Sequence, residues 1–312
     1  MSVTSIVLDV GLVTLGVIGL WVGATQFVRG ASRLARRLGV SGLVIGLTIV
    51  AFGTSAPEFA VTLDAALAGK SDISIANVLG SNLFNLGFIL GGAALVAVLP
   101  TSKLLVRRDS AALVGATLLV LGLVSDRFVS RLDGIVLVVL LVAYLAVLVR
   151  TDAGAVSAQT ASNSSFSPSD IARLGGGLAI VVLGAHGLVF GASDLARVAG
   201  VSEWLIGVTI VAAGTSTPEF VTSIAAARQG RAGISAGNIV GSCLFNFLGV
   251  LGVAGVVQPL PVSGDAVWSL WWLLGVVLLV TVFLWSKQVL SRLEGAVLVL
   301  LNAANWAIGL LS

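Results

Sequence analysis

The chain has 312 residues, of which 57% are hydrophobic and only 10% are charged. Soluble domains carry about 25% charged residues, so the composition excludes a soluble globular protein and predicts an all-α, polytopic protein in a lipid bilayer. The formal net charge is +3, but the basic residues flank apolar segments, and we expect no nucleic-acid partner. The single cysteine excludes an internal disulfide and a cysteine-rich metal site. The first apolar run lacks a basic segment before it and a small-residue cleavage site after it, so no cleavable signal peptide is expected.

Apolar segments of roughly 18 or more residues are typical of membrane-spanning helices, and the sequence predicts ten of them. They are expected at 6–28, 43–69, 77–99, 108–125, 132–150, 172–192, 204–228, 237–258, 266–286 and 293–311. A polar, small-residue segment ending in a proline separates the fifth helix from the sixth, which indicates a flexible linker. We therefore expect a first five-helix unit at 1–150, a linker at 151–168 and a second five-helix unit at 169–312.

The two halves are copies of each other at a constant offset of 161 residues. Gly39-Val40-Ser41 matches Gly200-Val201-Ser202, and Ser130-Arg131-Leu132 matches Ser291-Arg292-Leu293. Matches that keep one offset over nearly the whole chain indicate duplication, because chance similarity between apolar helices would not keep register. Five helices per half is an odd number, so the second half is expected to enter the membrane from the opposite side, as an inverted repeat.

The distribution of basic residues predicts the orientation of the chain in the membrane. With the N-terminus outside, the cytoplasmic loops contain 13 of the 17 lysines and arginines, and the outer loops contain 4. Cytoplasmic loops carry an excess of these residues, so both termini are expected outside, the linker in the cytoplasm and the protein in the cell membrane. Inverted repeats with matching elements are a common plan of secondary transporters, whose binding site lies at the midplane between the repeats.

Each half contains one motif that is costly to place in a membrane. Ala51–Phe59 (AFGTSAPEF) and Ala212–Phe220 (AAGTSTPEF) share seven of nine residues. A charged side chain at the bilayer centre costs roughly 2.5–3.5 kcal/mol on insertion scales. The proline in each motif removes a backbone donor and breaks the helix, which frees carbonyl oxygens upstream. Ala51 and Ala212 lie at the expected breaks, so their carbonyls are candidate ligands.

The duplicated elements together supply only oxygen ligands. The first motif contributes hydroxyls and a carboxylate from each half, and a second element, GSxLFN, contributes a serine and an asparagine four residues apart on one helical face. These residues are Thr54, Ser55, Glu58, Ser81 and Asn85, with Thr215, Ser216, Glu219, Ser242 and Asn246. Hydroxyl, amide, carboxylate and carbonyl oxygens suit a hard cation such as Ca²⁺, which takes about 6–8 of them. Two carboxylates balance one Ca²⁺ or two Na⁺, so the two ions are expected to compete.

The paired GTSxPE and GSxLFN motifs, in an arrangement of five plus five helices, resemble the cation/Ca²⁺ exchanger superfamily, in particular its prokaryotic sodium/calcium exchangers. The resemblance covers nearly the whole chain. It implies a secondary antiporter that exchanges Na⁺ for Ca²⁺ by alternating access, with the first and sixth helices sliding across the bundle. It further implies Ca²⁺ binding by Glu58, Glu219, Thr54 and Thr215, and Na⁺ binding around Ala51, Ser55, Ser81, Ala212, Ser216 and Ser242.

Asn85 and Asn246 are expected to be central amides of the site. Several members of the superfamily, including potassium-dependent exchangers, carry aspartate where Asn246 stands, which argues against K⁺ co-transport and leaves the number of Na⁺ per Ca²⁺ open. Proton-coupled members usually have a GNxPE-type motif, so the GTSxPE motif favours sodium as the driving ion.

Two other transport functions remain open. In an H⁺/Ca²⁺ antiporter, protons would compete for the same carboxylates, and in a cation channel the carboxylates would form a selectivity ring. No nucleophile–base pair or metal–water centre indicates an enzyme, no cofactor is expected beside the transported ions, and no oligomer is required. Asp64 is expected to be a vestibule or end-of-helix residue and not a ligand, and His186 a packed, hydrogen-bonded histidine and not a proton sensor.

Overall fold

The computed structural model describes residues 3–152, 167–200 and 212–311, and nearly all of them are helical. Seven helices in this part of the chain are long and apolar enough to cross a membrane, and a bent pair of helices at 42–67 brings the number to eight. The protein is thus a multi-pass helical membrane protein, as predicted. The other two expected spans correspond to 212–228, whose beginning lies outside the described residues, and to the last helix, so the number of ten stays a prediction.

The first half consists of helical segments, several of them interrupted by a π-helical stretch, and of two short strands. In chain order they are α1 (Val3–Leu38), α2 (Gly42–Ile45), η1 (Gly46–Val50), α3 (Ala51–Thr54), α4 (Ala56–Leu67), α5 (Ser71–Phe84), η2 (Asn85–Ile89), α6 (Leu90–Val96), β1 (Leu99–Pro100), η3 (Leu105–Asp109), α7 (Ser110–Leu123), η4 (Val124–Asp126), β2 (Phe128–Val129) and α8 (Arg131–Asp152). The predicted end of the first helix, at residue 28, was wrong. The helix continues through its basic residues and ends at Leu38, because Gly39 then takes a left-handed conformation with φ of 66°.

The second half repeats this order after the linker region. Its elements are α9 (Pro168–Ile171), η6 (Ala172–Gly176), α10 (Gly177–Val198), α12 (Ala212–Thr215), α13 (Thr217–Arg228), α14 (Ala232–Leu244), η8 (Phe245–Leu251), α15 (Gly252–Val257), β3 (Leu260–Pro261), α16 (Gly264–Lys287), β4 (Val289–Leu290) and α17 (Arg292–Leu311). Most of the expected linker lies outside the described residues. Ser167 begins α9 with a capping box, in which its side chain and that of Asp170 bond the backbone reciprocally.

The segments α5–η2–α6 and α14–η8–α15 form the centre of the bundle. In their apolar windows 72% and 83% of the residues are buried, compared with 22% for α1 and 17% for α8. The main apolar core packs around these two segments and reaches α7 and α16. The side chains that the sequence predicts as ligands on these segments therefore lie deep inside the protein.

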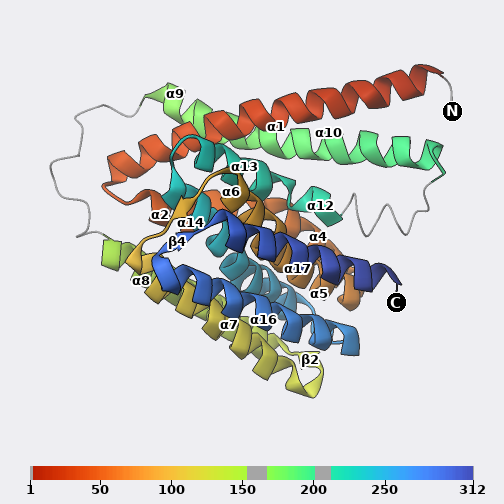
Figure 1. Ribbon diagram of the computed structural model, residues 1–312. Helices are drawn as coiled ribbons and strands as arrows, with labels where there is room; N and C mark the ends of the chain where they lie inside the picture. The colour runs from red at the N-terminus through yellow and green to blue at the C-terminus, as the bar shows by residue number, and fades with distance from the viewer. Residues whose placement is uncertain (1–2, 153–166, 201–211, 312) are drawn as a thin grey trace.

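Helices α1 and α10 lie side by side along one flank of the bundle (Figure 1). Glycines bring the two backbones together: a Cβ on Gly16 would lie 2.9 Å from the carbonyl oxygen of Gly184, and a Cβ on Gly23 would lie 2.9 Å from that of Gly177. Small residues allow such close approach of helices in membranes. These helices are the first and the sixth predicted spans, and they pack as one pair.

Two short strand pairs, which the sequence analysis did not predict, join the halves. β1 pairs with β4 through Leu99 opposite Leu290, and β2 pairs with β3 through Val129 opposite Leu260. Both pairs are antiparallel, and each one is the other shifted by 161 residues with the halves exchanged. The contacts between the halves are thus reciprocal.

Candidate functional site

Both duplicated GTSxPE motifs bend the helix that carries them. The backbone leaves helical geometry at Ser55, with φ of −83° and ψ of 9°, and at Ser216, with φ of −88° and ψ of 5°. Each proline then occupies the first turn of the next helix, where its missing N–H is harmless. The axes of the two parts of the first motif's helix differ by 48°.

The break lies four residues beyond the predicted position. Ala51 is inside a helical segment, and its carbonyl accepts the backbone N–H of Ser55 at 3.0 Å. The helix distortion near Ala51 is instead the π-helical stretch η1, which ends at Val50. Ala212 begins α12 at the edge of the described residues. The predicted helix break at Ala51 was therefore wrong, because the proline acts on the turn directly before it.

The two glutamates are held by serines of the opposite half. Ser55 Oγ donates a hydrogen bond to Glu219 Oε1 at 2.7 Å, and Ser216 Oγ donates one to Glu58 Oε1 at 3.0 Å. All four side chains are buried, with 0–1% of their surface exposed. The serine and glutamate of each motif thus point toward the other motif, and the two motifs form one site.

The remaining predicted site residues differ in how directly they contact the two glutamates. Ser242 Oγ donates to Glu219 Oε1 over 3.5 Å, a long bond. Asn246 Nδ2 donates to Asn82 Oδ1 at 3.0 Å, so this central amide bonds an asparagine of the other half that the sequence analysis did not single out. Ser81 and Asn85 are buried as well, but no hydrogen bond among the described residues ties either of them to a carboxylate. Thr215 lies directly before the break at Ser216 and is partly exposed.

The sequence analysis missed two asparagines that support the glutamates. Asn77 Nδ2 donates to the Glu58 carbonyl at 3.1 Å and to Thr62 Oγ1 at 2.8 Å. Asn238 Nδ2 donates to the Glu219 carbonyl at 3.4 Å and to Ser223 Oγ at 2.9 Å. The duplication could have found them, since both are asparagines at the offset of 161, four residues before Ser81 and Ser242.

The site concentrates negative charge that no basic side chain balances. In the described part of the chain, none of the salt bridges reaches Glu58 or Glu219. One oxygen of each carboxylate, Oε2, and Asn246 Oδ1 are buried without a hydrogen-bond partner among the described residues. Buried carboxylates need a partner, because an unpaired charge inside a protein is strongly unfavourable. The arrangement therefore suits a cation that these oxygens ligate, or protons.

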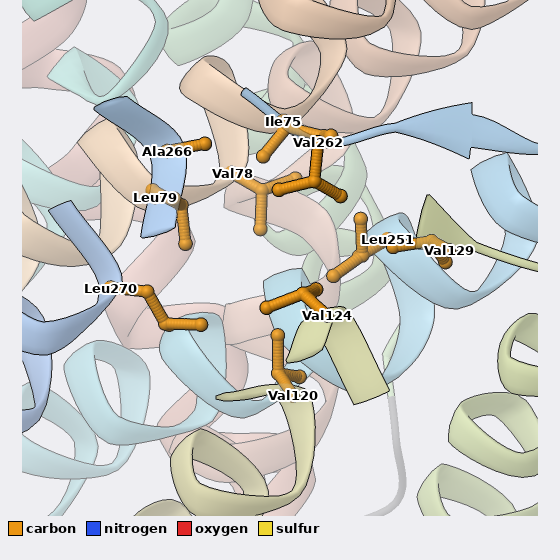
Figure 2. Close-up of a pocket in the computed structure, with 10 residues that line it drawn as sticks. All are labelled: Ile75, Val78, Leu79, Val120, Val124, Val129, Leu251, Val262, Ala266 and Leu270. Atoms are coloured by element: carbon orange, nitrogen blue, oxygen red, sulfur yellow. The ribbon is translucent and has the colours of Figure 1, made fainter. Parts of the chain in front are cut away.

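Other candidates lie outside this site. Asp64 is exposed, as expected for an end-of-helix residue. His186 is also exposed, so the prediction that it is packed was wrong. Within residues 3–152, 167–200 and 212–311, no three histidine, cysteine, aspartate or glutamate side chains come together. The cavity in Figure 2, of about 10 Å³, has aliphatic walls only, and it offers no oxygen ligand to an ion.

The fold and the site together define a multi-pass membrane protein with a buried, acidic, oxygen-lined site between two duplicated halves. The family model described as sodium/calcium exchanger protein matches residues 8–150 and 170–307. The chain belongs to this family of membrane cation transporters, and it is a cation/Ca²⁺ exchanger.

Individual proteins and solved structures agree with this assignment. The chain is 37% identical to the putative antiporter CaxA of Alkalimonas amylolytica, over 83% of this chain and 82% of CaxA. It is 31% identical to the sodium/calcium exchanger MaX1 of Methanosarcina acetivorans, over 94% of this chain and 96% of MaX1. The structure of the sodium–calcium exchanger NCX_Mj soaked with zero Na⁺ and Ca²⁺ superposes with a TM-score of 0.87 and 32% identity, and the match covers 98% of this chain and 100% of NCX_Mj.

Proposed function

We propose that this chain is a secondary antiporter that exchanges Na⁺ for Ca²⁺ by alternating access, with both ions using the site at Glu58 and Glu219 in turn. In this proposal Ca²⁺ is bound by the two carboxylates with Thr54 and Thr215. Na⁺ is bound around Ser55, Ser81, Ser216 and Ser242 and the carbonyls of Ala51 and Ala212, and the two central amides complete the site. The transported ions are the only ligands required.

The reciprocal serine–glutamate bonds carry this proposal. A Ser55 hydroxyl that donates to Glu219 at 2.7 Å places its own oxygen beside the carboxylate of the other half. The free Oε2 atoms of Glu58 and Glu219 are buried on the same two motifs. A cation that binds both carboxylates therefore joins the halves, and each hydroxyl can exchange its hydrogen bond for a bond to the ion. Two charges balance one Ca²⁺ or two Na⁺, which supports mutually exclusive occupancy.

The helix pair α1–α10 is the element proposed to slide across the rest of the bundle. The buried apolar residues of this pair belong to a second cluster, separate from the main core around α5 and α14, which includes Ile45 and Val50 of the bent helix and a few residues of α13 and α14. We further propose the division into two inverted five-helix repeats, with both termini outside and the linker in the cytoplasm. In Figure 1 the beginning of α1 and the end of α17 lie toward the same end of the bundle, which supports termini on one side.

The direct test is a flux measurement in vesicles that contain the purified protein. Vesicles loaded with Na⁺ are diluted into Na⁺-free medium with radioactive calcium, and we expect calcium uptake that requires the outward Na⁺ gradient. Calcium uptake that is independent of the Na⁺ gradient but depends on an imposed pH gradient would refute the proposal and indicate H⁺/Ca²⁺ exchange. Single-channel currents in a planar bilayer would refute the antiporter proposal and indicate a cation channel.

A further inference from the structure

Thr54 is a proposed ion ligand whose hydroxyl proton has a specific acceptor on the other half of the protein. Thr54 Oγ1 lies 3.0 Å from Asn238 Oδ1, and both residues are fully buried. The same hydroxyl lies 3.1 Å from the Val50 carbonyl and 3.4 Å from the Ala51 carbonyl. A hydroxyl has one proton, so it can donate fully to only one of these oxygens at a time.

The neighbours of Asn238 determine which side of its amide faces Thr54. The Glu219 carbonyl, 3.4 Å away, can only accept, so the NH₂ group of Asn238 must point at it. Ser223 Oγ accepts from the same group at 2.9 Å. If the amide were turned over, its oxygen would face the carbonyl oxygen of Glu219 without a proton between them. The oxygen of Asn238 is therefore directed at Thr54.

This orientation matters for a hydroxyl that binds a cation. A metal ion attracts the lone pairs of the oxygen and repels its proton, so the proton needs an acceptor that faces away from the ion. Asn238 bonds both the Thr54 hydroxyl and the Glu219 carbonyl, so a single side chain joins Thr54 to the backbone of a proposed Ca²⁺ ligand. If the proton goes to Asn238, the lone pairs of Thr54 and the carbonyl of Ala51 remain available for an ion.

We propose that Asn238 is a positioning residue for ion binding, which accepts the Thr54 proton and so turns the Thr54 oxygen toward the cation. It simultaneously holds the Glu219 backbone, so one amide links the bent helices of both halves. This inference rests on the proposed function, because it takes Thr54 as a Ca²⁺ ligand. It adds a residue that binds no ion itself and that acts across the boundary between the repeats.

The test is a double-mutant cycle read by equilibrium binding of radioactive calcium to the purified protein, which does not depend on the driving ion. Asn238→Leu keeps the size of the side chain and removes the acceptor. A hydrogen bond is worth about 0.5–1.5 kcal/mol net, so we expect the Ca²⁺ dissociation constant to rise about 2- to 10-fold. Thr54→Val removes the partner, and Asn238→Leu should then weaken Ca²⁺ binding by a smaller factor than it does in the wild type, since residues that act through one contact are not additive.

Asn77→Leu is the matched control. Asn77 holds the Glu58 carbonyl and Thr62 in the same way as Asn238 holds Glu219 and Ser223, and its described hydrogen bonds do not include Thr54. In the double variant, the fold-changes of the Ca²⁺ dissociation constant caused by Asn77→Leu and by Thr54→Val should therefore multiply. If Asn238→Leu does not give a monodisperse protein, Asn238→Ala removes the same acceptor with less volume in the core.

Two results overturn the inference in distinguishable ways. If the wild-type protein binds Ca²⁺ and the Asn238 and Thr54 effects multiply as those of the control do, Asn238 supports the fold only, and the proposed function stands. If the wild-type protein binds no Ca²⁺, the proposed function fails, and the inference fails with it.

Discussion

Replacing one central glutamate by glutamine is the most direct perturbation of the proposed site. Glu58 and Glu219 are 1% and 0% exposed, and one oxygen of each already accepts a serine hydroxyl. Glutamine has nearly the same shape, and its carbonyl oxygen can still accept that bond. What Glu58→Gln or Glu219→Gln removes is one negative charge, together with the free oxygen at Oε2.

The expected loss of ion-binding free energy follows from the burial of the charge. At an effective dielectric constant of about 20, two unit charges about 4 Å apart interact with roughly 4 kcal/mol. Removing one carboxylate therefore makes the binding free energy less favourable by about 8 kcal/mol for a divalent ion and by about 4 kcal/mol for a monovalent ion. Because each 1.4 kcal/mol is tenfold in affinity, Ca²⁺ binding should fall by roughly six orders of magnitude. We expect both variants to show no measurable Na⁺-driven calcium uptake in vesicles.

Two controls separate the loss of a charge from the loss of the fold. Cys243, the one cysteine of the chain, is fully buried, so maleimide labelling should remain absent in the folded variants and appear only in denaturant. Asp64→Asn removes a carboxylate from the same helix, α4, at an exposed position, and uptake should continue. Calcium uptake at the wild-type rate in either glutamine variant would show that the carboxylates do not share an ion.

Three further predictions concern the surroundings of the site. Asn246→Asp loses the 3.0 Å bond to Asn82 Oδ1 and adds a charge, so we expect slower release of Ca²⁺ and an altered Na⁺ dependence, and unchanged exchange kinetics would exclude Asn246 from the site. Gly23→Ala places a Cβ 2.9 Å from the Gly177 carbonyl, whereas the nearest atom at Gly19 is 3.7 Å away. Gly23→Ala should therefore destabilise the protein by about 1–3 kcal/mol and slow exchange, and thermal unfolding of Gly19→Ala should match the wild type. The ion pair of Arg33 and Asp170, 2.6 Å long, joins α1 to α9, but the arginine side chain is 44% exposed. Arg33→Gln should change the unfolding free energy by less than about 1 kcal/mol, and a larger loss in a denaturation curve would mean that this pair holds the two helices together.

Much of the fold is readable from local patterns. Long apolar segments need no partner to be recognised as membrane helices, and the constant offset of 161 residues makes the two halves visible without any structure. The glutamates stand out for the same local reason, since a carboxylate inside an apolar run requires a binding partner. The errors in helix ends also have local causes. Basic residues 29–37 looked like a loop, but they continue α1, because only Gly39 supplies the conformation that ends a helix.

The contacts across the halves could not be read in this way. Nothing near Asn238 in the sequence indicates that its amide oxygen meets a threonine 184 positions earlier. The two strand pairs are equally remote, because each two-residue strand finds its partner in the other half. His186 was expected to be packed because it is a polar residue in an apolar helix, yet its side chain lies on an exposed face of α10.

By itself the sequence determines which chemical groups this protein can present to an ion: two carboxylates, several hydroxyls and amides, and no cysteine or histidine cluster. It also determines that each half carries one copy of the motif. Only the tertiary structure decides that Ser55 bonds Glu219 and that Ser216 bonds Glu58. The physical reason is that the shortest hydrogen bond to each carboxylate, 2.7 Å to Glu219 and 3.0 Å to Glu58, comes from a hydroxyl of the opposite motif. The site therefore exists only where the two halves meet.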